Sequence, residues 1–353
     1  MFSCLNNYGR IYFMKNIFKL LIASIIGLLI FLFVMQIVGW GKINEAIILF
    51  SGVKGLIIVL LTFLMAIISC LSWKLILRSQ GFNVPIKELI KLWLAGFSIS
   101  YLTPFALLGG EAFQIYLLNK KFNINWEKST ASVIIRKILN ATFFLLFLII
   151  GVLSFCLYGY FPSGTMIWLV FLVIGGLFGS LLFFYFKILK KESILRWLLK
   201  FIGIREDKIE GHKNGKIIFN TEREIIEFFS SKSKIFWQSF MFAFLRYFLL
   251  FFRTGLIIFF LGEGIETLKV LSVYGFTNFA LMFPFPAGLG SAEAASAFTF
   301  NALGMGAGNG TIYAMTLRAA DLFLCLLGIV ISIKLGLNLA EKKLLNFVDK
   351  LKS

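Results

Sequence analysis

Long apolar blocks separated by short polar and basic segments run along the whole chain. Six blocks have about the roughly 20 residues that a helix needs to cross a bilayer. They comprise residues 17–38, 56–77, 138–158, 166–186, 235–261 and 317–335. Only helices and closed barrels satisfy all backbone hydrogen bonds in hydrocarbon, and these blocks are too long and too uniformly apolar to be barrel strands. The pattern therefore predicts an all-α integral membrane protein with six transmembrane helices.

Two further segments are apolar but interrupted. Residues 96–118 (GFSISYLTPFALLGGEAFQIYLL) and 275–300 (GFTNFALMFPFPAGLGSAEAASAFTF) each begin apolar, break at proline, pass through glycines and resume with a glutamate. Proline and glycine end helices and permit sharp turns, so we predict that each segment is a re-entrant helical hairpin. The hairpin turns are predicted at Pro104, Gly109, Gly110, Pro284, Pro286, Gly288 and Gly290.

One offset of 182 residues relates the two interrupted segments. It carries Pro104 onto Pro286, Glu111 onto Glu293 and Arg136 onto Arg318. These matches predict an internal duplication within a single membrane domain of residues 1–353, with a first repeat over about 17–158 and a second over about 166–337. Each repeat would cross the membrane three times, and three is odd. The repeats must then insert in opposite orientations, with their hairpins entering from opposite faces.

The distribution of basic residues predicts the orientation. There are 35 Lys and Arg against 17 Asp and Glu, a formal charge of +18, and most of the basic residues flank the apolar blocks. This placement suits lipid headgroups and excludes nucleic acid as the expected partner. Re-entrant hairpins put the basic segments on one face, which the positive-inside rule assigns to the cytoplasm: both termini and residues 78–91, 120–128 and the loop 187–234. Residues 39–54, 159–165, 263–266 and 301–316 would lie on the opposite face of the cell membrane.

Metal and histidine chemistry have little material in this sequence. The four cysteines, Cys4, Cys70, Cys156 and Cys325, are scattered, and the one histidine, His212, lies in a charged loop. Neither the cysteines nor the histidine have the spacing of a metal site or a disulfide framework. We therefore expect no metal and no cofactor.

Seven charged residues interrupt apolar segments, where each costs at least about 2.5–3.5 kcal/mol at the bilayer centre. They are Glu111, Arg136, Arg246, Arg253, Glu293, Arg318 and Asp321. The duplication predicts that Glu111 pairs with Arg136 and Glu293 with Arg318, and Asp321 can share Arg318, three residues away. Four positive and three negative charges leave one positive charge over.

An uncompensated positive charge beside helix N-termini is what an anionic headgroup requires, so we predict that these seven residues bind one. A structural alternative stays open. The ion pairs can serve only to pin the hairpins, and the arginines can extend to the interface.

The two interrupted segments resemble the lysylphosphatidylglycerol synthetase-like transmembrane family, also called the flippase-like domain family. Thr103, Pro104, Gly109, Gly110, Glu111 and residues 117–118 match its first motif, and Pro284, Pro286, Gly288, Gly290 and Glu293 match its second. The resemblance implies a domain that moves or presents lipid, as the flippase half of the multiple peptide resistance factor flips aminoacylated phosphatidylglycerol. Residues 105–107 differ from the corresponding residues of relatives, which often include a small polar or basic one. The resemblance therefore does not identify the lipid headgroup.

We therefore expect a flippase or translocator for an anionic phospholipid or a lipid-linked substrate. The alternative is a non-transporting membrane subunit that serves a separate lipid synthase or glycosyltransferase. Because the chain ends at Ser353, just after its last predicted span, we expect no transferase domain and no synthase activity.

Overall fold

A computed structural model describes residues 39–102, 109–158, 165–203, 213–231, 233–282 and 288–352, together with residues 29, 32, 33, 36 and 285. In these ranges every regular element is a helix, which confirms the predicted all-α class. The helices are α2 (Gly41–Ser51), α3 (Val53–Ser79), α4 (Ile86–Leu102), α5 (Gly109–Phe122), α6 (Trp126–Leu157), α7 (Thr165–Leu189), α8 (Ile194–Ile202), α10 (Lys213–Ser230), α11 (Lys234–Phe260), α12 (Thr267–Ala280), α13 (Ser291–Ala302) and α14 (Ala307–Lys352).

Five of the described helices are long and apolar enough to cross a membrane. They lie in α3, α6, α7, α11 and α14 and coincide with five of the six predicted blocks. The remaining block, residues 17–38, lies outside the described residues except for four isolated positions. Helix α6 begins at Trp126 and α14 at Ala307, whereas the apolar blocks predicted starts at 138 and 317. Hydropathy marks only the apolar part of a helix, and the polar first turns are helical too.

A unit of four helices occurs twice in the chain. Its members begin at residues 53, 86, 109 and 126 in the first copy and at 234, 267, 291 and 307 in the second. Corresponding helices are therefore 181 or 182 residues apart, so the periodicity seen in three motif residues extends to whole elements. The unit consists of one long helix, two shorter helices and a second long helix.

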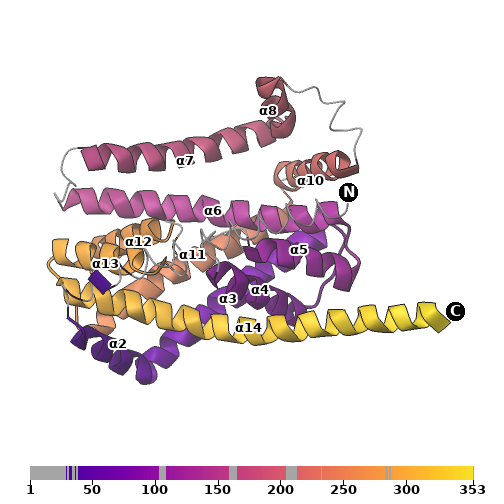
Figure 1. The fold of residues 1–353 in the computed structure, drawn as a ribbon. Coiled ribbons are helices and arrows are strands. Elements are labelled where there is room, and N and C mark those ends of the chain that lie inside the picture. Colours follow the sequence, from indigo (N-terminus) through magenta and orange to yellow (C-terminus); the bar gives the residue numbers. More distant parts are fainter. Residues whose placement is uncertain are drawn as a thin grey trace.

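The two copies exchange equivalent contacts. Helix α12 packs against α6, and its counterpart α4 packs against α14, while the two first helices, α3 and α11, pack against each other. In Figure 1, α6 and α14 run across the molecule, with α12 and α13 toward one end and α4 and α5 toward the other. Helix α7 lies along the outer side of α6, and α10 packs on α6 at the end where α5 lies.

Both reciprocal interfaces depend on a glycine that lets two helices touch. In α6, a Cβ on Gly151 would lie 2.4 Å from the carbonyl oxygen of Leu271 and 2.7 Å from the Cα of Gly275 in α12. In α14, a Cβ on Gly328 would lie 2.2 Å from the carbonyl oxygen of Leu94 in α4. Close backbone approach at small residues is the usual way in which membrane helices gain packing energy without a hydrophobic driving force.

The basic loop segments meet at one end of the molecule. Lys121 in the last turn of α5 contacts Glu88 in the first turn of α4 at 2.5 Å. The end of α5 therefore lies beside the start of α4. The hydrogen bond from Lys121, and to a smaller extent that from Lys91, lowers the pKa of Glu88 below its usual value. Lys128 of α6 donates to the carbonyl oxygen of Gln80 at 3.1 Å and lies 3.9 Å from Glu224 of α10. Residues 78–91, 120–128 and helix α10 of the 187–234 loop thus share one face.

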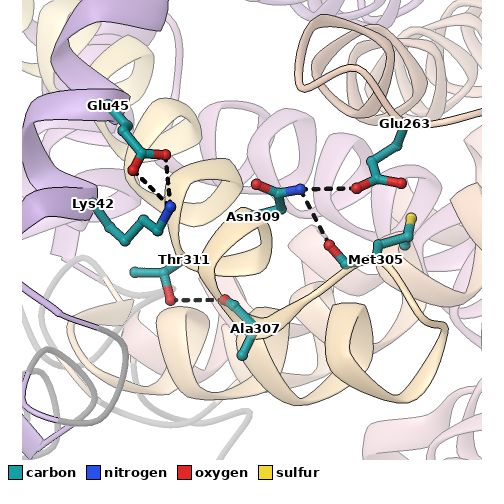
Figure 2. Close-up of polar contacts among 7 residues, drawn as sticks. All are labelled: Lys42, Glu45, Glu263, Met305, Ala307, Asn309 and Thr311. Atoms are coloured by element: carbon teal, nitrogen blue, oxygen red, sulfur yellow. Dashed lines mark hydrogen bonds and ion pairs between the residues drawn. The ribbon is translucent and has the colours of Figure 1, made fainter.

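The less basic segments meet at the opposite end of the molecule, where α2, α12 and α14 begin (Figure 1), and Figure 2 shows polar contacts there. Asn309 of α14 donates to Glu263 in the loop before α12 at 2.8 Å. On α2, Lys42 forms an ion pair with Glu45 at 2.6 Å, and a Cβ added to Gly308 would lie 2.8 Å from the Cε of Lys42. Residues 39–54, 263–266 and 301–316 therefore come together, away from the basic end.

Candidate functional site

An ion pair with a fully buried carboxylate joins α13 to α14. Glu293, in the first turn of α13, has 0% exposed surface. One of its carboxylate oxygens accepts from Arg318 Nη2 at 2.9 Å and from the Gly290 backbone N–H at 2.9 Å, and the other contacts Arg318 Nη1. Arg318 Nη2 also donates to the carbonyl oxygen of Gly288 at 3.0 Å. The pairing of Glu293 with Arg318 predicted from the duplication is present.

Glycine is required at the turn that receives this arginine. Gly288 and Gly290 have φ of +62° and +81°, a region that residues with a Cβ rarely adopt. This conformation aims the Gly288 carbonyl at Arg318 and the Gly290 N–H at Glu293, so the turn and the ion pair hold each other. Pro284 and Pro286, the other predicted turn residues in this hairpin, lie outside the described residues.

A second ion pair links α11 to α14, and it corrects a prediction. Asp321 was expected to share Arg318, but its carboxylate lies 3.3 Å from Arg253 of α11. Arg253, with 7% of its surface exposed, also donates to the Thr62 hydroxyl of α3 at 2.9 Å. Arg318 is already bound to Glu293, and the partner available to Asp321 comes from another helix, which spacing along one helix cannot reveal.

The first repeat does not form the predicted pair between Glu111 and Arg136. Glu111 of α5 contacts Lys137 at 2.8 Å. Arg136 instead donates to the side-chain oxygen of Gln114 at 2.5 Å and lies over the Trp73 ring of α3 at 4.3 Å. Consecutive helical residues point about 100° apart, so Lys137 reaches Glu111 while Arg136 lies between Gln114 of α5 and Trp73 of α3.

Two of the four predicted arginines have no acidic contact among the described residues. Arg136 is 5% exposed, and its Nε and Nη1 have no acceptor among the described residues. Arg246 of α11 lies over the Tyr247 ring at 5.1 Å, and its buried Nε likewise has no acceptor there. Because Lys137 takes Glu111, two positive charges are uncompensated where the sequence predicted one.

The remaining predicted residues fall into two groups. Pro104, Cys4 and His212 lie outside the described residues. Gly109 begins α5, and Gly110 faces α4, where an added Cβ would lie 1.8 Å from the Gly96 carbonyl oxygen. Over the described ranges no cluster of His, Cys, Asp and Glu is suited to a metal ion, and the cysteines described are free thiols.

Sequence reasoning missed four side chains of this site. Lys137, Gln114, Thr62 and Trp73 each contact one of the predicted charged residues. Lys137 carried a signal, because it is a second cation next to Arg136 in an otherwise apolar helix. The other three are ordinary residues of membrane helices, and only the packing of those helices identifies them.

Comparison with known proteins gives one family and two relatives. The family model described as lysylphosphatidylglycerol synthase TM region matches residues 16–328. A UPF0104 membrane protein of Methanocaldococcus jannaschii is 28% identical over 163 residues, which are 46% of this chain and 47% of that protein. Another, of Methanothermobacter thermautotrophicus, is 28% identical over 137 residues, 39% of this chain and 40% of the relative. The matches thus span less than half of each relative's length. No solved structure matches the chain.

Proposed function

Since the chain belongs to the family of the lysylphosphatidylglycerol synthase transmembrane region, we propose that it carries an anionic phospholipid or lipid-linked substrate between the leaflets of the cell membrane. The protein is a multi-pass membrane protein. The proposed function is that of a flippase or translocator, and the membrane phospholipids themselves are its partners.

The observation that carries the proposal is the set of charged side chains buried or partly buried within the helix bundle. Two ion pairs and two arginines without acidic contacts lie among helices that are long and apolar enough to cross a bilayer. Charges at membrane depth are costly, and they typically mark substrate or ion pathways in membrane proteins. The net positive charge of the group suits a phosphate-bearing headgroup.

The proposed arrangement has six crossings and two re-entrant hairpins that enter from opposite faces. The contact of Glu88 with Lys121 supports a first hairpin, α4–α5, that returns to the basic end. At the other end, the Tyr158 hydroxyl at the end of α6 donates to Glu266 at 2.9 Å, next to the start of α12. The hydrogen bond of Asn309 to Glu263 supports the return of α12–α13 to that same end. Inverted repeats with broken helices are a recurrent architecture of transporters.

The positive-inside rule places the basic end in the cytoplasm, and with it both chain termini. A substrate headgroup would then leave the cytoplasmic or the outer interface, pass the charged residues of the helix bundle and reach the other face. The four-helix repeats supply the two halves that can rock against each other during such a step.

Lipid movement in liposomes tests this function. Full-length protein reconstituted in liposomes that contain fluorescent phosphatidylglycerol should expose inner-leaflet label to an impermeant quencher, and protein-free liposomes should not. Glu293→Gln and Arg318→Gln should lower the rate at least about tenfold, whereas Arg223→Gln, in an exposed ion pair on α10, should leave it unchanged. Equal rates in the presence and absence of wild-type protein would refute translocation.

A second candidate function is that of a membrane subunit for a separate synthase or glycosyltransferase. A polar pocket at the basic end favours this function. The pocket lies between the start of α6 and α10 and is lined by side chains of both charges. Its lining consists of Asn125, Glu127, Lys128, Asn220, Arg223, Glu224 and Glu227. Co-purification of such an enzyme with wild-type protein, lost on Arg223→Glu and combined with no lipid movement, would select this function over translocation.

A further inference from the structure

Helix α8 has an apolar face that the described part of the chain leaves largely uncovered. The helix is nine residues long, and none of these residues is buried. At 100° per residue, four exposed apolar side chains lie on one side of it and Arg196 and Lys200 lie on the other. The four are Trp197, Leu198, Ile202 (58% exposed) and Phe201 (81% exposed). A short helix with this division is typical of a membrane interface.

Helix α8 lies where a membrane-spanning helix leaves the bilayer. It follows α7, whose apolar span is Leu172–Leu189, after residues 190–193. The Trp197 ring packs against Phe183 near the end of α7, with ring centroids 4.9 Å apart, so α8 folds back beside the end of α7. Figure 1 shows α8 at the same end of the molecule as α5 and α10, which is the basic end. Its apolar face is therefore at the boundary between lipid and water.

Exposed lysines flank this face. Lys190 and Lys191 lie just before α8, and Lys200 lies in its last turn. None of the three has an acidic contact among the described residues, whereas Lys187 is paired with Glu192 at 2.5 Å. Lysine side chains beside an apolar helix face extend to the phosphates of anionic lipids, which attract them.

We propose that α8 and the turn before it bind the surface of anionic lipid in the leaflet at the basic end. The apolar face lies at the acyl boundary, and Lys190, Lys191 and Lys200 lie at the phosphates. This docking surface is separate from the charges within the helix bundle, so the inference goes beyond the proposed function. Charge complementarity favours lipid as the occupant, because α8 combines aromatic and aliphatic side chains with cations and contains no acidic residue.

The start of α8 is held by α10. Glu222 of α10 accepts from the Leu195 backbone N–H at 2.8 Å and from the Ser193 hydroxyl. The Ser193 hydroxyl oxygen in turn accepts from the Arg196 backbone N–H at 3.0 Å. Because these N–H groups already have acceptors, a headgroup binds at the lysine side chains and not at the helix start. The same contacts fix α8 on the bundle, so its apolar face keeps one orientation.

Quenching of a fluorescent label locates the apolar face. The four native cysteines of the full-length protein are replaced by alanine, and a nitrobenzoxadiazole dye is attached at Phe201→Cys or, as a reference in water, at Ser231→Cys. Both positions are exposed, so the substitutions do not disturb a core. The protein is placed in nanodiscs of phosphatidylcholine with an increasing fraction of phosphatidylglycerol. Spin-labelled lipid quenches the dye from the acyl region, and iodide quenches it from water.

We expect the label at Phe201→Cys to be quenched by spin-labelled lipid and protected from iodide as the fraction of phosphatidylglycerol rises. The label at Ser231→Cys should stay open to iodide. Lys200→Gln should lower the ratio of protected to open label about fivefold, which corresponds to about 1 kcal/mol for one lysine near an anionic surface. Lys216→Gln, an exposed lysine of α10, is the matched control and should not change the ratio. High salt should act like Lys200→Gln.

Three results would overturn the proposal. Equal iodide quenching of the two labels in every nanodisc would mean that the face lies in water. Protection from iodide without quenching by spin-labelled lipid would mean that protein covers it. Equal protection in phosphatidylcholine alone, unchanged by Lys200→Gln, would remove the preference for anionic lipid. Because quenching needs no lipid movement, a docked α8 in a protein that does not flip lipid would refute only the proposed function. An undocked α8 in a protein that flips lipid would refute only this inference.

Discussion

Glu293 and Arg318 show how a charge is kept inside an apolar bundle. A buried carboxylate is tolerated when its lone pairs are used, and here a guanidinium and the Gly290 backbone N–H supply the donors. A buried ion pair need not make a protein more stable than an apolar pair of similar volume would. Removing only one partner, however, is destabilising because it leaves the other charge buried and unpaired. Arg136 and Arg246 represent the opposite situation, because no carboxylate contacts them among the described residues and some of their buried nitrogens lack an acceptor there.

We predict that Arg318→Met lowers the free energy of unfolding by about 3–5 kcal/mol, because it strands a carboxylate with no exposed surface. The double variant Arg318→Met with Glu293→Leu should recover part of that loss. Thermal unfolding in detergent, analysed as a double-mutant cycle, gives the coupling. Lys269→Met, whose partner Glu266 is exposed, is the matched control and should cost less than about 1 kcal/mol. Additive effects of the two substitutions would contradict the role of the pair.

At the scale of the element, the helices are placed by backbone contact at small residues. The contact of α6 with α12 and its reciprocal, α4 with α14, each has a glycine at closest approach. Hydrophobicity cannot decide such packing in a bilayer, since lipid tails are as apolar as leucine. The packing depends on the shapes of the helix surfaces, and glycine, which has no Cβ, lets two backbones approach closely.

We predict that Gly151→Ala destabilises the fold by about 1–3 kcal/mol, because its Cβ would meet the Leu271 carbonyl and the Gly275 backbone, which cannot rotate away. Gly175→Ala in α7 is the matched control. It has open space at the Cβ position, so its stability should be unchanged or slightly higher. Denaturant or thermal unfolding of both variants in the same detergent provides the comparison. Equal stability of the two would show that the α6–α12 contact can relax.

At the scale of the whole molecule, the described loops divide into two sets at opposite ends of the helices. Basic segments meet at the end where α4 and α5 begin and finish, and the less basic ones meet where α2, α12 and α14 begin (Figure 1). The division agrees with the segments that the positive-inside rule groups together. The two four-helix units place their short helices at opposite ends of the molecule, α4 and α5 at one and α12 and α13 at the other. The internal duplication and the division of the loops therefore describe the same arrangement.

We predict that the two ends face opposite sides of the cell membrane. In a variant whose four native cysteines are replaced by alanine, Asn44→Cys on α2 should react with an impermeant maleimide on intact cells. Ser231→Cys, after α10, should react only once the membrane is opened. Both positions are exposed, so access to the reagent depends on the side of the membrane and not on burial. The reverse pattern would invert the orientation, and equal labelling of both would refute the topology.

The sequence by itself determined the helical class, five of the six expected spans and the recurrence of Glu111 and Arg136 as Glu293 and Arg318. These follow from hydropathy and spacing, which are local or additive along the chain. It also led to the Glu293–Arg318 pair. Only the tertiary structure showed that Glu111 pairs with Lys137 and that Asp321 pairs with Arg253. It also showed that Arg136 and Arg246 have no acidic contact among the described residues. The partner of a buried charge depends on which way its helix faces and on which helix lies opposite, and neither is written in the residues of one segment.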